Sequence, residues 1–235
     1  MPVFSVSNMR IVCCTIAGIF LFVSATLAAS KPHVITYGKW TTVKWMADTE
    51  ESKPMDHKLR ALYVDGRMKE FTLGTLHEIT DRLFVVRRAF RVNDMLPEET
   101  APRWHWERGG WLLVDRVTGR ISPLNLPDFD PYYSAVSWYR DYAAYCGLSD
   151  DGKKSFVMVA QLGHRKPILK QALGDLPKND LPKEDDPPDS LCSILMWQRQ
   201  PPRVTFALKG GQKTTYVIRG HIVDLASEEE KDDTQ

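Results

Sequence analysis

The chain has 235 residues, with 31 Lys and Arg, 30 Asp and Glu, and a formal net charge of +1. This balance excludes the strongly basic class of nucleic-acid-binding proteins, so we expect no nucleic-acid partner. The only charged residue before Lys31 is Arg10, and residues 11–29 are apolar or small.

The first thirty residues resemble a targeting segment. A basic residue, an apolar run and the small residues Ala28, Ala29 and Ser30 are typical of a secretory signal. We therefore predict a cleaved signal peptide at 1–30 and an exported protein, either periplasmic or secreted. The alternative is a membrane anchor through residues 11–29, a run just long enough to span a bilayer. No later segment approaches that length, so we expect no membrane span after cleavage.

The remaining chain predicts a single all-β domain over residues 31–227. Its apolar runs are short, β-branched and aromatic, and turn residues separate them. The expected strands are Val34–Tyr37, Val43–Met46, Leu59–Val64, Met68–Leu73, Leu83–Val92, Arg103–Arg108, Trp111–Asp115, Arg120–Leu126, Val136–Leu148, Phe156–Leu162, Pro167–Leu169, Cys192–Gln198, Arg203–Leu208 and Thr215–Val223. Residues 175–190 are rich in proline and acids and predict an exposed loop, and 228–235 predict a disordered acidic tail.

Short glycine turns recur between these strands. Asp65-Gly66 is well suited to a type I′ hairpin turn. Gly109-Gly110, Asp151-Gly152 and Gly210-Gly211 occupy comparable places, and their spacing suggests about four units of roughly 45 residues each. The predicted fold is therefore a set of antiparallel hairpins, propeller-like with about four small units. A β-sandwich with long hairpins is the alternative.

One hairpin carries a family resemblance. Residues 147–154, GLSDDGKK, are similar to the Ser-x-Asp-Gly-Lys hairpin of WD40-like and TolB-type propeller repeats. Residues 115–120, DRVTGR, resemble the Asp-x-x-Thr-Gly turn of related blades. The resemblance covers about 40 residues and implies a propeller-like arrangement, although the other units lack the motif.

The cysteines predict one disulfide bond. Cys146 and Cys192 are the only two that follow the signal segment, and each belongs to an apolar, strand-like run. An even pair in an oxidising compartment indicates a bridge, which we expect to stabilise the fold by roughly 3–4 kcal/mol. Two buried free thiols are the alternative.

Motifs for catalysis and metal binding are sparse. Gly147-x-Ser149 begins like a nucleophile elbow, but the next glycine is one position late and the turn joins two strands, so Ser149 is expected to be a turn residue. The six histidines show no metal-ligand spacing, so we predict no metal site, no cofactor and no catalytic residue. Asp128 and Asp130 offer two carboxylates to a cation or ligand, with a solvated loop as the alternative.

Tryptophan is the most unusual feature of the composition, because all seven lie after the signal segment. Trp104 and Trp106 share one face of their strand, and Trp111 is expected across from them, beyond the Gly109-Gly110 turn. If exposed, such a group stacks on a sugar or a peptide, and if buried, it fills the core. The candidate ligand-binding residues are Trp104, Trp106, Trp111, Asp128 and Asp130.

Together these features predict a non-catalytic binding or assembly domain in the cell envelope or outside the cell. Its partner is expected to be a protein or a carbohydrate. The alternative is a hydrolase acting on envelope or extracellular polymer. A cleft lined by carboxylates near Trp104, Trp106 and Asp128 would support that alternative.

Overall fold

The fold is built of strands. The computed structural model describes residues 31–45, 55–149, 151, 153–175, 192–208 and 213–226. These residues form fifteen strands in three antiparallel sheets, which confirms the all-β, antiparallel prediction. None of the described residues forms a helix long and apolar enough to cross a membrane.

Several predicted segments lie outside the described residues. They are the signal peptide at 1–30 with its alternative anchor at 11–29, most of the loop at 175–190, and the tail at 228–235. Asp175 itself is described, and it ends a strand and does not begin the loop.

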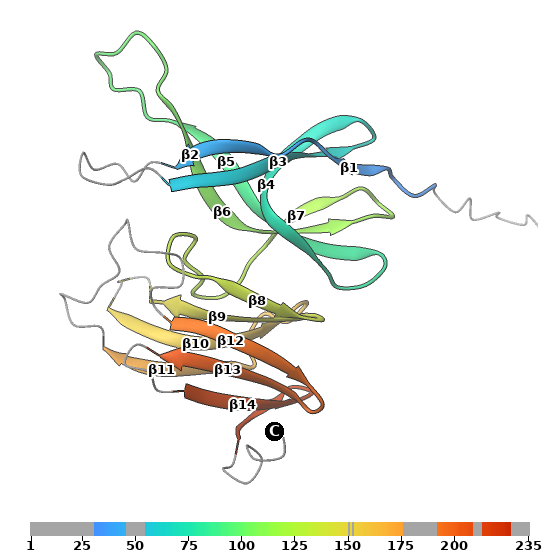
Figure 1. Ribbon diagram of the computed structural model, residues 1–235, viewed down its shortest axis with the longest axis vertical. Helices are drawn as coiled ribbons and strands as arrows, with labels where there is room; N and C mark the ends of the chain where they lie inside the picture. Colours follow the sequence, from blue (N-terminus) through green and yellow to red (C-terminus); the bar gives the residue numbers. More distant parts are fainter. Residues whose placement is uncertain are drawn as a thin grey trace, which may run out of the picture. The chain divides into compact units, whose positions relative to one another are not determined.

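The first sheet has the strand order β1-β3-β4-β5-β6-β7, with β2 also beside β3 (Figure 1). Its strands are Ile35–Tyr37 (β1), Thr41–Trp45 (β2), Met55–Val64 (β3), Arg67–Glu78 (β4), Leu83–Asn93 (β5), Trp104–Asp115 (β6) and Ile121–Leu124 (β7). Asp65-Gly66 joins β3 to β4 with φ angles of 52° and 74°, so the predicted hairpin is confirmed. Pro123 lies in β7, an edge strand that tolerates a residue without an N–H.

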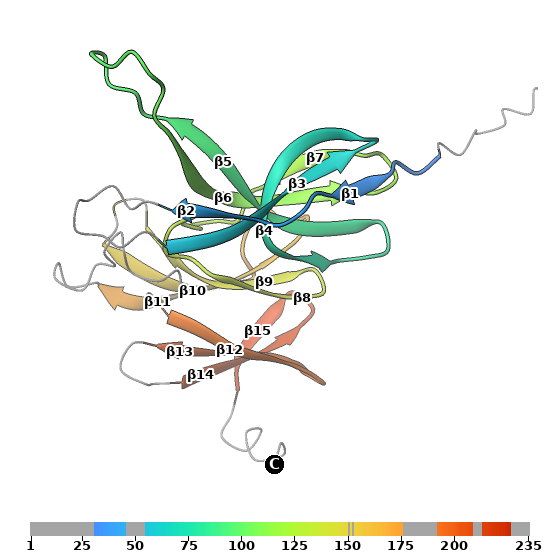
Figure 2. The ribbon, with the colours of Figure 1, turned by 45° about the horizontal axis from the view of Figure 1, so that its top comes forward.

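The other two sheets have four strands each, in the orders β11-β10-β9-β8 and β12-β13-β14-β15 (Figure 2). The second sheet contains Val136–Tyr139 (β8), Tyr142–Leu148 (β9), Lys154–Gln161 (β10) and Leu169–Asp175 (β11). The third contains Cys192–Arg199 (β12), Pro202–Leu208 (β13), Lys213–Arg219 (β14) and Ile222–Leu225 (β15).

The second sheet is buried on both faces. One face of β9 and β10, with Cys146 and Val157, packs against the third sheet in a cluster that includes Phe206. The other face, with Tyr145 and Met158, packs against the first sheet. Strands covered on both sides are expected to be continuously apolar, which explains the sequences of β9 and β10. The hairpin of β9 and β10 lies in the interior of its sheet, between β11 and β8.

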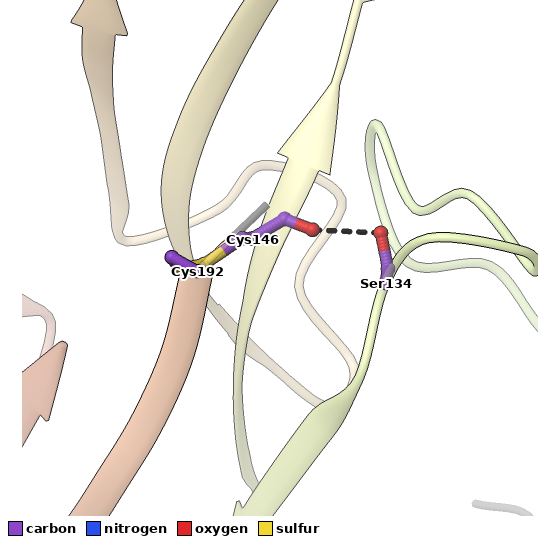
Figure 3. Close-up of a disulfide and its surroundings, with 3 residues drawn as sticks. All are labelled: Ser134, Cys146 and Cys192. Carbon is purple, nitrogen blue, oxygen red and sulfur yellow. Dashed lines mark hydrogen bonds between the residues drawn. A yellow bond between two sulfur atoms is a disulfide. The ribbon is translucent and has the colours of Figure 1, made fainter. Parts of the chain in front are cut away.

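A disulfide bond joins the second sheet to the third (Figure 3). Cys146 of β9 and Cys192 of β12 are both buried, and their Cα atoms are 6.0 Å apart, within the range of protein disulfides. The hydroxyl of Ser134 donates a hydrogen bond of 2.7 Å to the carbonyl oxygen of Cys146. The predicted bridge is therefore present, and it links two strands that lie 46 residues apart in the chain.

The predicted hairpin at Gly109-Gly110 is wrong. β6 is one strand of twelve residues that runs through both glycines. Arg87 pairs with Trp111 and Ala89 with Arg108, so Gly109 and Gly110 together face the single residue Arg88 in a β-bulge. A Cβ on Gly109 would lie 3.1 Å from the Cβ of Arg88, so the glycine allows a close approach and does not form a turn.

Two other strands were predicted too long. Val136–Leu148 is divided into β8 and β9 by a two-residue turn at Arg140-Asp141. Thr215–Val223 is divided into β14 and β15 at Gly220-His221. Of the four predicted glycine turns, Asp65-Gly66 is a turn and Gly109-Gly110 is not, while Gly152 and Gly210-Gly211 lie outside the described residues. The likeness to propeller repeats stays a prediction.

Candidate functional site

The three candidate tryptophans lie on the same strand and the same face. The bulge at Gly109-Gly110 shifts the alternation of β6 by one residue, so that Trp104, Trp106, Arg108 and Trp111 share one face. Their neighbours on that face of β5 include Arg87 and Arg91. We call these six residues the Trp/Arg ladder. Trp111 thus continues the row begun by Trp104 and Trp106 and does not sit across from them.

Exposure changes steeply along the ladder. Trp111 is 9% exposed and packs edge-on against Trp138 of β8, with 5.2 Å between ring centres. Arg108 is 5% exposed, whereas Trp104 at the far end is 52% exposed. The inner end therefore belongs to the core between the first and second sheets, and the outer end faces solvent.

The inner half of the ladder contains two arginines, Arg87 and Arg108, and neither forms an ion pair with a described residue. The half-buried Arg87 donates from Nε to the carbonyl of Gly109, and its two Nη groups donate to the carbonyls of Ser134 and Pro131. Arg108 donates to the carbonyl of Tyr132 at 3.3 Å, and its guanidinium lies 4.5 Å from the ring centre of Trp45. These contacts fix the loop at 131–134 to the first sheet.

Burial at the inner end of the ladder disfavours the charged state of its basic groups. Burial, together with the neighbouring charge of Arg108, lowers the pKa of Arg87 to about 10. Burial also lowers the pKa of Arg108. Burial and the two guanidinium charges lower the pKa of His57, which favours the neutral imidazole at this position. Arg87 stays charged at neutral pH because a pKa of about 10 is still well above 7.

Asp128 and Asp130 serve the fold in different places. One carboxylate oxygen of Asp130 accepts the backbone N–H groups of Tyr132 at 2.7 Å and Tyr133 at 3.1 Å. Its charge also favours protonated Arg87 and Arg108. Asp128 instead pairs with Lys170 of β11 at 2.9 Å.

These two aspartates line a pocket of about 460 Å³, with Leu148 and Ser149 on its other side. The structure thus brings Asp130 to the inner end of the ladder and does not bring Asp128 there. Ser149 accepts the N–H of Lys154 and donates to Asp151, so it is placed as a turn residue. Across the described part of the chain, no three His, Cys, Asp or Glu side chains are close enough to hold a metal ion.

The outer end of the ladder lies on a two-stranded arm. Residues 90–93 of β5 and 104–107 of β6 pair only with each other, because β4 stops pairing at Ala89 and β7 pairs only beyond Gly110. Figure 1 shows this pair extending past the other strands of its sheet. An isolated pair of strands is marginally stable, so the arm must be supported by side-chain contacts.

One face of the arm is supported by cation–π contacts. The Arg91 guanidinium lies 5.1 Å from the ring centre of Trp104 and 5.6 Å from that of Trp106. Phe71 of β4 packs edge-on against Trp106, with 4.9 Å between ring centres. Contacts of this type stabilise by about 0.5–1 kcal/mol each at exposed sites. They order Arg91 and Trp104 while leaving both exposed.

The opposite face of the arm carries a polar network. His105 contacts Glu107 at 2.8 Å and Asp94 at 3.3 Å. The hydroxyl of Tyr132 donates to the second oxygen of Glu107 at 2.5 Å. At the tip, Glu99 accepts the N–H of Leu96 and pairs with Arg103 at 3.3 Å. The tip is therefore held by its own hydrogen bonds.

This ordered tip presents apolar side chains to solvent, which the sequence reasoning missed. Met95 is 43% exposed and Leu96 is 52% exposed, beside the equally exposed Trp104. The signal was present, because Met95-Leu96 is an apolar pair inside a segment otherwise made of polar residues and prolines. Adjacent exposed apolar groups of this kind mark interaction surfaces more often than isolated ones do.

Comparison with known proteins adds no functional information. No protein-family model matches the sequence, and the search of curated proteins finds no match.

Proposed function

We propose that this protein is an exported binding or assembly domain that contacts a partner protein through the arm. The compartment is supported by the buried Cys146–Cys192 disulfide, since stable disulfides are characteristic of oxidising compartments. The predicted signal peptide at 1–30 agrees with this assignment.

The observation that carries the proposal is the exposure of Met95, Leu96 and Trp104 on an ordered two-stranded arm. Trp, Met and Arg are enriched at protein interfaces, and Trp and Arg dominate binding hot spots. Arg91 is exposed between two indoles, and no described carboxylate lies within ion-pairing distance of it. A pre-ordered surface of this composition loses little conformational entropy on binding.

The composition of the tip favours a protein over a carbohydrate as the partner. A sugar stacks on an aromatic face but gains little from Met95 and Leu96, whereas a protein surface buries all three apolar groups together. The hydrolase alternative would need free carboxylates near the tryptophans. Of the described acids on the arm, Asp94, Glu99 and Glu107 are engaged in its contacts, and Glu98 is an exposed residue of the tip. The contacts of the three engaged acids favour binding over hydrolysis as the function of the arm.

The experiment uses a W104A/L96S double variant of the mature protein. Wild-type protein is used to isolate an envelope or secreted partner, and the dissociation constant is then measured with the purified partner. We expect the double variant to bind at least about 30-fold more weakly, as the loss of a hot spot requires. An I222S variant, which changes an exposed apolar residue of β15, is the matched control and should bind normally.

Thermal unfolding of both variants checks that the fold is retained, since both altered arm side chains are exposed. If W104A/L96S binds the purified partner as tightly as wild type, the arm is not the contact surface. Binding of the wild type to a glycan array, lost in W104A/L96S, would show that the partner class is carbohydrate and would refute the protein assignment.

A further inference from the structure

A second pocket lies where the three sheets meet. It has a volume of about 410 Å³ and is lined by His77–Ile79 at the end of β4, Trp138–Arg140 at the β8–β9 turn, and Arg199 at the end of β12. None of these residues belongs to the arm. We propose that this pocket binds an acidic saccharide, with its ring against the aromatic walls and its carboxylate held by Arg140 and Arg199.

The walls of the pocket are rigid aromatic stacks. His77 stacks on Trp138 with 5.8 Å between ring centres and 19° between ring planes. Tyr139 stacks on Trp197 at 5.4 Å and 24°, and the Trp197 indole donates to the carbonyl of Ser137 at 3.2 Å. These contacts hold His77, Trp138 and Tyr139, the three aromatic side chains that line the pocket, in fixed positions, so packing the apolar face of a ring against them costs little conformational entropy.

The charge of the pocket is positive. No described carboxylate lies within ion-pairing distance of Arg140 or Arg199. Glu78 is the one acid among the lining residues, and its carboxylate accepts two hydrogen bonds of 2.7 Å from Arg116. Asp141, beside Arg140 in the turn, accepts a hydrogen bond of 2.8 Å from Gln161. A guanidinium presents paired donors that match a carboxylate. Two such groups at one pocket therefore favour an anionic ligand.

The backbone of Arg140 supports a functional role. Its φ is 52°, in the left-handed region, at the first position of the two-residue turn between Tyr139 and Tyr142. Turns of this kind favour Gly, Asn or Asp at such a position, because a larger side chain is strained there. His77 holds the Arg140 carbonyl with a hydrogen bond of 2.8 Å, and the guanidinium lies 5.4 Å from the Tyr139 ring centre. Strained residues of this kind cluster at binding sites.

The volume and the lining together narrow the ligand to a ring with a charged group. A pocket of about 410 Å³ is within the size range of small-ligand sites and accommodates a sugar ring. A simple inorganic anion would use the arginines but not the aromatic walls. A neutral sugar would use the walls but leave both arginines without a partner.

The test measures binding of D-glucuronate to the mature protein by titration calorimetry. D-glucose and inorganic phosphate serve as ligands that lack the charge or the ring. We expect saturable binding of glucuronate only, and a loss of affinity of about tenfold or more in R140N and in R199Q, because each removes a charge-assisted contact. The matched control is R165Q, which removes an exposed arginine in the β10–β11 turn and should bind normally.

Arg140 also allows a readout that a merely structural residue would not give. Asparagine adopts the left-handed conformation more readily than arginine, so R140N should lose affinity while its Tm stays equal or rises by a few degrees, about 2–4 °C. Absent glucuronate binding, equal binding of phosphate or glucose, or unchanged affinity in R140N would each overturn the proposal. The W104A/L96S variant should bind glucuronate normally, which separates this site from the arm.

Discussion

Replacing Gly147 by alanine should lower the stability of the protein more than the addition of a single methyl group suggests. Gly147 is buried in β9, and an added Cβ would lie 2.6 Å from the carbonyl oxygen of Asp128. Relaxing that contact to an ordinary C···O distance near 3.3 Å requires a backbone shift of about 0.7 Å. The Asp128 carbonyl also accepts the N–H of Leu148 at 3.0 Å, so the shift weakens that hydrogen bond.

The two effects set the magnitude. Overpacking a buried site costs about 1–3 kcal/mol, and weakening a buried hydrogen bond adds about 1 kcal/mol. We expect G147A to lower the free energy of unfolding by about 2–4 kcal/mol and the Tm by about 5–15 °C for a domain of this size. Thermal and urea unfolding followed by circular dichroism measure both quantities.

Gly110 supplies the matched control. It lies in the bulge of β6, and no atom is within 4 Å of a Cβ built there. G110A should therefore be as stable as wild type or slightly more stable, since alanine restricts the unfolded chain. Wild-type stability in G147A, or an equal loss in G110A, would refute the steric argument.

Two further predictions concern the core. Intact mass should show no alkylated thiol in the mature protein without reductant, and C146A and C192A should each lower the free energy of unfolding by roughly 3–4 kcal/mol; two thiols that alkylate without reductant would contradict the bridge. Burial raises the pKa of Tyr37 to about 12 and that of Tyr145 in the same direction. Because the fold favours the neutral phenols, stability should be complete below pH 10 and fall as the pH rises towards 12. Urea midpoints across this range, with Y37F losing less than wild type, measure the effect, and a flat profile would contradict it.

The sequence predicted those parts of the fold that depend on local signals. Asp65-Gly66 forms the expected turn because both residues adopt positive φ. The apolar runs of β9 and β10 predicted two strands, and the packing of these strands between two other sheets explains why both of their faces are apolar. The disulfide was predicted because two cysteines follow the signal segment and an exported protein is expected in an oxidising compartment.

The errors have a common physical cause. A glycine is needed either for a positive φ or for close approach of another atom, and the sequence does not distinguish the two. Gly109 lies in a bulge and not in the predicted turn, and it allows Arg88 to approach closely. Conversely, the turn at Arg140-Asp141 contains no glycine, because contacts with His77 and Tyr139 hold Arg140 in place. His77 lies far from Arg140 in the sequence, and the packing of Arg140 on the Tyr139 ring leaves no sequence pattern.

The Trp/Arg ladder shows why the candidate site was only partly predictable. The residue types of its two ends are the same, and only the second sheet, which covers the inner end, makes them different. At the inner end, burial lowers the pKa of Arg87 and so weakens its preference for the charged state. Hydrogen bonds to carbonyl groups offset part of this effect. This inner end fixes the base of the arm, and fixing the base gives Arg91 and Trp104 a defined position in solvent. Substitutions at the inner end should therefore act mainly through stability, whereas those at the outer end should act mainly through binding, with a loss of about 0.5–1 kcal/mol for each cation–π contact removed.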